Sequence, residues 1–186
     1  MYKLLFVLVM AVLVVLSCVA WLGHEVYTTG FSAKTEPPYL EVTLVRQFRR
    51  AAIPSEIRNR PNPVPASPAV LAEGLEHFAD HCAGCHAPDG SGDTPIGKNV
   101  SPRVPDLRQK DIQSLSDGAL FFVIHNGIRF TAMPAWGDGD MEKDRGSWAL
   151  VHFIRHLPQL THEELNRMQS FIPTTPHHDE GGVHHH

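Results

Sequence analysis

The fold of this chain depends on the stretch Cys82-Ala83-Gly84-Cys85-His86. Its C-x-x-C-H pattern is typical of covalent attachment of a c-type haem. Two thiols three positions apart on one helical turn can each form a thioether with one of the two haem vinyl groups. The adjacent imidazole can then bind the iron on the proximal side. The stretch therefore predicts one covalent haem c, attached through Cys82 and Cys85, with His86 as a metal ligand.

Other chemistries of paired cysteines fit the chain less well. A structural zinc site needs a second Cys or His pair at ligand spacing, and the sequence has no other C-x-x-C. A thioredoxin-like redox pair belongs in a βαβ setting, and no such pattern is visible. A disulfide between Cys82 and Cys85 would close a very small ring and leave His86 without a role.

A soft sixth ligand is expected downstream, and Met133 in Thr131-Ala132-Met133-Pro134-Ala135-Trp136 is the best candidate. The stiff proline and the large tryptophan beside it favour a positioned thioether. His125 is predicted to be a solvated or capping residue rather than an axial ligand. The remaining methionines lie in the N-terminal apolar run, in a charged loop or beyond the last helix of the domain: Met1, Met10, Met141 and Met168.

Helical patterns flank the attachment stretch. Ser67 is a favourable N-cap and Pro68 a favourable first residue for a helix that carries apolar residues at helical spacing up to residue 82. Further helices are predicted at 118–125 and 147–157. A Thr161-His162-Glu163-Glu164 capping box opens a short last helix that reaches about residue 171. The sequence therefore predicts an all-α domain of a few helices with long loops.

Together these features make residues 67–157 resemble the monohaem class I cytochromes c. They occur in the same order: a helix into C-x-x-C-H, a Gly/Pro-rich loop, a helix, a Met-Pro loop and a last helix with Trp148. The resemblance implies that the last helix crosses the first and that Leu107 belongs to the haem pocket. It also implies that a proline carbonyl accepts a hydrogen bond from His86. Candidates are Pro88, Pro95 and Pro102.

One charged residue near the predicted pocket has two interpretations. Arg129 lies between the helix at 118–125 and Met133. It could neutralise a haem propionate and so contribute to cofactor binding, or it could be an ordinary surface arginine. The sequence leaves both open.

The N-terminal residues 4–22 form an apolar run without charge that is long enough to span a bilayer as a helix. Trp21 at its end suits the membrane interface. A signal peptide usually has a shorter apolar core and an A-x-A-like cleavage site, so an uncleaved anchor is favoured. Cys18 follows a stretch that loosely resembles a lipobox, and its lipidation would also tether the chain to a membrane.

Residues 40–52 predict an amphipathic helix. Leu40, Leu44 and Phe48 repeat every four residues, and the arginines gather near the C-terminal end. This helix could lie on anionic lipid headgroups, or it could connect the anchor to the haem domain by packing on it or on a partner subunit. A proline-rich extended linker follows at 59–66.

The predicted organisation has four parts: a membrane anchor (1–23), an amphipathic helix and Pro-rich linker (24–66), a cytochrome c haem domain (67–158), and a short helix with a His-rich tail (159–186). The tail could bind a divalent metal such as Zn, Cu or Ni. It could also be a disordered polar end or part of a purification tag.

Composition narrows the classes of function. The 186 residues carry a formal net charge of −4, which argues against nucleic-acid binding. Three cysteines, two of them in the attachment stretch, cannot form a disulfide framework. If His86 and Met133 fill both axial positions, no open site is left for a small-molecule substrate. The expected protein is therefore an electron carrier and not an enzyme.

The predicted function is single-electron transfer between redox protein partners of a respiratory chain by a membrane-tethered cytochrome. Alternatives are a haem-bearing subunit fixed within a membrane oxidoreductase complex and a haem sensor with a displaceable Met133. The family resemblance implies haem attachment on the outer face of the energy-transducing membrane. The expected location is thus the bacterial inner membrane, with a single span and a periplasmic haem domain.

Overall fold

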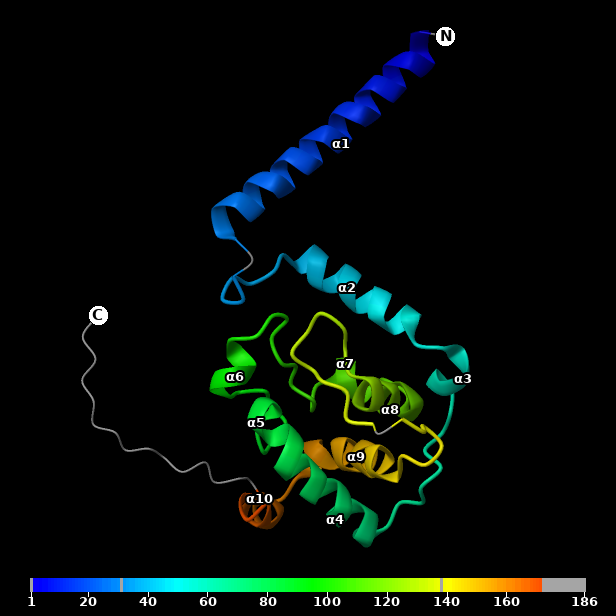
Figure 1. The fold of residues 1–186 in the computed structure, drawn as a ribbon, viewed down its shortest axis with the longest axis vertical. Helices are drawn as coiled ribbons and strands as arrows, with labels where there is room; N and C mark the ends of the chain where they lie inside the picture. Colours follow the sequence, from blue (N-terminus) through cyan, green and yellow to red (C-terminus); the bar gives the residue numbers. More distant parts are fainter. Residues whose placement is uncertain (1, 31, 138, 172–186) are drawn as a thin grey trace, which may run out of the picture.

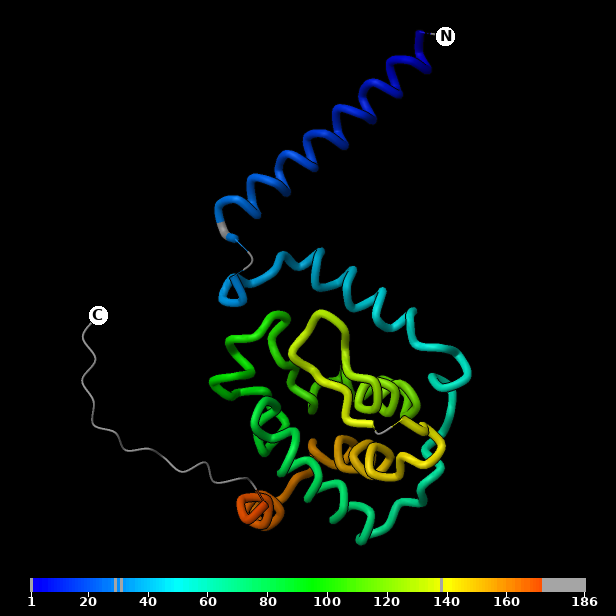
Figure 2. Tube along the Cα trace, viewed as in Figure 1, coloured from blue at the N-terminus to red at the C-terminus, as the bar shows by residue number. Residues whose placement is uncertain are grey.

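A computed structural model describes residues 2–30, 32–137 and 139–171. Within these ranges the chain forms helices joined by loops and contains no strand, which confirms the all-α fold. A long N-terminal helix, α1 (Tyr2–Thr29), projects from a body built by the other elements (Figures 1 and 2). These are α2 (Tyr39–Ala52), α3 (Ser55–Arg58), α4 (Pro68–His77), the π-helix η1 (Phe78–Cys82), α5 (Ala83–His86), α6 (Pro95–Lys98), α7 (Lys110–Gln113), α8 (Asp117–Asn126), α9 (Arg145–His156), the 3-10 turn η2 (Leu157–Gln159) and α10 (His162–Gln169).

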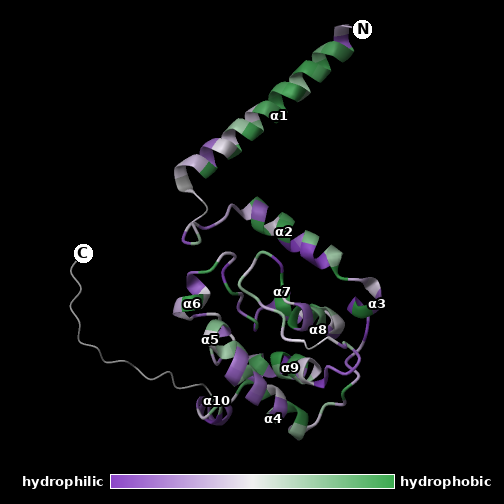
Figure 3. Cartoon of the chain, in the orientation of Figure 1, coloured by the Kyte–Doolittle hydropathy of each residue, from purple (hydrophilic) through white to green (hydrophobic). Residues whose placement is uncertain are grey.

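The helix α1 includes the predicted apolar run at 4–22 and extends beyond it by residues 2–3 and 23–29. It is apolar along most of its length (Figure 3), and none of its most apolar stretch is buried. Within the described ranges it is the one helix that is long and apolar enough to cross a membrane. A signal sequence near the N-terminus can also meet this criterion of length and composition, so α1 fits either an anchor or a signal.

Helix boundaries follow the capping residues that the sequence predicts. The Ser67 hydroxyl accepts a hydrogen bond from the Val70 amide at 3.2 Å, with Pro68 as the first residue of α4. The capping box at Thr161 is present in α10. At the other end of a helix, Gly127 stops α8 with a φ of +65°, a conformation that glycine adopts without strain.

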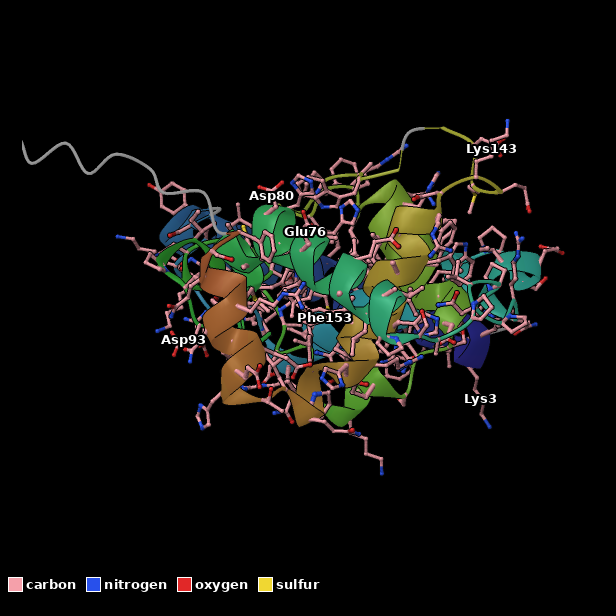
Figure 4. All side chains as sticks on the ribbon, turned by 90° about the horizontal axis from the view of Figure 1, so that it is seen from below. Lys3, Glu76, Asp80, Asp93, Lys143 and Phe153 are labelled. Carbon is pink, nitrogen blue, oxygen red and sulfur yellow. The ribbon has the colours of Figure 1, made fainter. Side chains whose placement is uncertain are left out.

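The helices α4 and α9 cross at close range, which confirms the expected contact between the first and last helices of the domain. A Cβ atom added to Gly74 would lie 2.5 Å from the carbonyl oxygen of Ala149 and 2.9 Å from the Cβ of Phe153. Only glycine fits this distance. Phe153 is fully buried between the two helices (Figure 4), and its ring lies 5.1 Å from that of Phe78.

The helix α8 completes the core against α9. The indole of Trp148 stacks on the ring of Phe121 with 4.0 Å between centroids and 10° between planes. Arg155 of α9 binds the carboxylate of Asp117 at the start of α8, 2.8 Å away. It also donates to the carbonyl oxygens of Gln113 and Leu115. Trp148 therefore packs in the core.

Segments before and after the predicted haem domain also contribute to its core. Ile53 and Ile57, which follow α2, are buried, as is Val64 of the predicted linker. Met168 of α10 is completely buried. Residues 59–66 are thus not a free spacer, because they lie against the body. The His-rich tail lies outside the described residues.

The α4–α9 contact gives a stability prediction. Gly74→Ala should destabilise the folded haem-loaded protein by roughly 1–3 kcal/mol, because the added methyl group overpacks the crossing. Gly146→Ala is the matched control in α9, where the nearest atom to the added Cβ lies 3.6 Å away. It should be neutral or stabilise by up to about 1 kcal/mol through helix propensity. Urea unfolding measures both, and equal effects of the two substitutions would contradict the close crossing.

Candidate haem site

The attachment stretch begins at a local change of helix type. The π-helix η1 ends at Cys82, and α5 then carries Cys85 and His86. Single π-turns are frequent at functional sites, and no pattern in the sequence predicts this one. The Cys82 thiol is largely shielded from water. Burial, together with the nearby Cys85, raises its pKa to about 12, so the group is a protonated thiol at neutral pH.

The imidazole of His86 is held in an apolar setting. Its ring lies 6.4 Å from the ring of Phe78. Burial lowers its pKa to about 4, while the backbone of Pro105 acts in the opposite direction. The ring is therefore neutral at pH 7, which is the form that binds a metal. Its Nδ1 atom is buried and has no partner at hydrogen-bond geometry within the described residues.

The proline beside His86 is not one of the three predicted from the sequence. None of Pro88, Pro95 and Pro102 acts on the ring, and the nearby backbone is that of Pro105. The chain after His86 turns back on itself, which brings this later proline to the motif. The Gly92 amide donates to the carbonyl of His86 at 2.7 Å. The Leu107 amide donates to the carbonyl of Gly90 at 2.8 Å.

Leu107, the predicted pocket residue, is buried in the core. Arg108 fixes its segment to the loop after the motif. The guanidinium lies 2.7 Å from an oxygen of Asp89 and 2.9 Å from an oxygen of Asp106. Hydrogen bonds from Arg108 hold the pKa of Asp106 well below its usual range. Both carboxylates are thus charged at neutral pH, and Leu107 stays in place beside Pro105.

Met133 lies half-exposed in the loop between α8 and α9. Its backbone closes a tight turn, in which the Met133 amide donates to the hydroxyl of Thr131 at 3.1 Å. Its carbonyl accepts from the Ile128 amide at 3.0 Å. The Met-Pro stretch is therefore shaped locally before it packs on the rest of the domain.

Three contacts hold the Met133 loop, two of them against α8 and one beside the attachment motif. A Cβ on Gly127 would lie 2.5 Å from the carbonyl carbon of Pro134, so the loop runs directly over the end of α8. The Trp136 amide donates to the Ile124 carbonyl at 3.1 Å. The indole of Trp136 also stacks on the ring of His81 at 5.1 Å. Since His81 directly precedes Cys82, this stack joins the segment that carries His86 to the loop that carries Met133.

Of the two roles predicted for His125, solvated or capping, the solvated role is wrong, because the residue is only 6% exposed. Its Nδ1 atom lies 2.6 Å from Oδ2 of Asp144, which is 9% exposed. A carboxylate only accepts, so the imidazole donates. Asp144 also caps α9 by accepting from the Ser147 amide. The pair thereby joins the end of α8 to the start of α9, across the loop that carries Met133. Sequence spacing alone could not reveal this partner.

Arg129 is exposed in the same loop and forms no ion pair with any described residue. The structure therefore brings together Cys82, Cys85, His86 and the segments of Leu107 and Met133, but does not join Arg129 to them. Sequence reasoning missed two supporting residues, Arg108 and Asp144, because their partners Asp89 and His125 are brought near only by the fold.

These side chains suit a haem c. The neutral, shielded imidazole of His86 directly follows Cys85, and the shielded thiol of Cys82 lies one helical turn earlier. The loop that carries Met133 is joined to this segment by the His81–Trp136 stack. Such a site in an all-helical domain with crossing first and last helices defines a class I c-type cytochrome. In agreement, residues 69–154 match the model of the family described as cytochrome C oxidase, cbb3-type, subunit III. This part of the chain is similar to that family, and the similarity implies electron transfer through covalently bound haem c and redox-protein partners.

The His125–Asp144 pair gives a prediction for the Met133 loop. Asp144→Asn keeps an oxygen to cap α9 but removes the charge that faces His125, and should cost roughly 1–3 kcal/mol of stability. Burial raises the pKa of Asp144, but hydrogen bonds from Ser147 and His125 lower it by more than burial raises it. The pKa of Asp144 is therefore below its usual value. The charged carboxylate therefore stabilises the fold above about pH 4, and this contribution is lost as the pH falls through the lowered pKa.

Urea unfolding of the wild type and of Asp144→Asn between pH 7 and pH 3 measures this effect. The difference in unfolding free energy should be largest at pH 7 and should shrink in acid. A difference that stays constant with pH would show that the charge of Asp144 does not act on the folded state.

Proposed function

We propose that the chain is a membrane-tethered, monohaem c-type cytochrome that carries single electrons between redox partners of a respiratory chain. Cys82 and Cys85 would hold the haem through thioethers, and His86 and Met133 would be the two axial ligands. When bound, the haem supplies the one-electron centre. The observation that carries this proposal is the neutral, shielded ring of His86 beside a Met-Pro loop held by the His81–Trp136 stack.

The protein groups around the haem would hold it rather than react. His86 and Met133 together leave no axial position for a small-molecule substrate. Methionine with histidine raises the reduction potential of a haem, which suits the high-potential end of a respiratory chain. Leu107 would cover part of the apolar face of the ring. Arg129, exposed in the Met133 loop, would be available to neutralise a haem propionate.

A second candidate is a haem-bearing subunit fixed within a membrane oxidoreductase complex. It is favoured by the description of the matching family as an oxidase subunit. Co-purification with membrane subunits after mild detergent extraction would support it, and a protein that elutes alone would support the free carrier.

Ligation by Met133 predicts how the reduced protein responds to CO. The wild type should not bind CO, because both axial positions are filled. Met133→Ala should open one position, bind CO and lower the reduction potential. Met141→Ala is the matched control, since Met141 is also half-buried in the loop between α8 and α9, and it should behave like the wild type. CO binding by the wild type would contradict Met133 ligation and favour a sensor.

The tether is proposed from α1, which is apolar, unburied and near the N-terminus. The proposed location is the bacterial inner membrane with one span. Covalent haem attachment in the family that the domain resembles takes place on the outer face of that membrane, so the haem domain would be periplasmic.

The state of the N-terminus can be measured directly. Intact mass spectrometry of the protein purified from membranes should give the mass of the chain with α1 retained and one haem added. A chain that begins at a lipidated Cys18 would move the tether from a span to a lipid. A shorter, soluble chain would show that α1 is a signal sequence and would exclude the tether.

A further inference from the structure

The helix α2 docks on the haem domain through its polar side. The guanidinium of Arg46 lies 2.9 Å from the carboxylate of Asp111 in α7. Arg50, one turn later, donates to the carbonyl oxygen of Asp111 at 2.9 Å. Ile53, directly after α2, is buried in the core. These contacts fix which face of α2 points toward the body.

The opposite face of α2 is apolar and exposed. Residues two positions apart on a helix point about 200° away from each other, so Leu44 and Phe48 face away from Arg46. We call this surface the α2 apolar face. The exposed fractions of its side chains are 67% for Leu40, 51% for Leu44, 46% for Val45 and 76% for Phe48. No residue of α2 is buried. An amphipathic helix usually turns its apolar side to the core, and here the order is reversed.

The position of α2 in the chain and in the fold identifies what this face meets. Only residues 30–38 separate α2 from α1, so α2 begins within about 35 Å of the end of the candidate span. In Figures 1 and 2, α2 forms the layer of the body on the side toward which α1 extends. The face turned away from α7 is therefore the face turned toward the membrane that α1 would enter.

The charge at the edge of this face fits anionic lipid. Arg49 lies between the apolar face and Arg46, and it forms no salt bridge with any described residue. α2 carries three basic residues and one acidic residue. Helices of this kind bury their apolar side at the boundary of headgroups and acyl chains and hold anionic headgroups with flanking basic residues.

We propose that α2 lies in the interface of the membrane that α1 spans, with Leu40, Leu44 and Phe48 among the lipids. The haem domain, fixed to the polar side of α2 by Asp111, then has a defined orientation on the bilayer. This inference rests on the proposed membrane tether. A hydrophobic surface of a partner subunit is the competing occupant.

The test uses the full-length, haem-loaded protein in nanodiscs of phosphatidylcholine with or without phosphatidylglycerol. Leu44→Cys and Phe48→Cys, each in a Cys18→Ala background, carry a nitroxide label. Ile96→Cys is the matched control, because Ile96 is 53% exposed on α6, away from α2. Electron paramagnetic resonance then compares the accessibility of each label to oxygen, which enters lipid, and to a nickel chelate, which stays in water.

Labels at positions 44 and 48 should show a severalfold higher ratio of oxygen to nickel accessibility than the label at 96, and a higher ratio with the anionic lipid than without it. Nickel access as high as at position 96, in protein that co-elutes with the nanodiscs, would overturn the lipid contact and leave the tether intact. Protein that does not co-elute would overturn the tether itself. Labels shielded in native membranes but open in lipid-only nanodiscs would assign the face to a partner subunit and not to lipid.

Discussion

The close approach of α4 and α9 at Gly74 is the constraint on which the haem domain depends. Backbone contact there lets Phe153 fill the space between the helices and meet Phe78. Phe78 begins the π-helix that leads to the cysteines, and its ring lies against that of His86. The crossing of two helices therefore sets the position of the proximal side of the site. A wider crossing would separate these aromatic rings, and with them the helix that carries the attachment residues.

The second half of the site depends on loops that the helices hold at both ends. The Met133 loop leaves α8 at Gly127, where a positive φ and contact with Pro134 turn the chain. It returns at Asp144, which binds His125 and caps α9. The segment with Pro105 is held in a similar way by Arg108 and two carboxylates. Charged pairs thus restrain the loops, whereas apolar packing restrains the helices.

The sequence predicted local features well and long-range pairs poorly. The caps at Ser67 and Thr161 depend on neighbouring residues, so the pattern of residues was enough to predict them. The attachment stretch was readable for the same reason. Burial of His125 and the approach of Pro105 were not, because each depends on a partner that only the folded chain brings near. The reversed packing of α2 was also hidden, since an amphipathic pattern gives the two faces but not which one meets the body.

The packing of residues 53–64 on the core has a consequence for encounter kinetics. Ile53, Ile57 and Val64 join α2 and the haem domain into a single body, so the distance between that body and α1 is limited by residues 30–38 alone. With α1 in a bilayer, a short connection of this kind keeps the redox centre at millimolar effective concentration near the surface. The search for a partner in the same membrane then becomes two-dimensional. The encounter rate would be set by lateral diffusion in the membrane and not by diffusion through bulk solution.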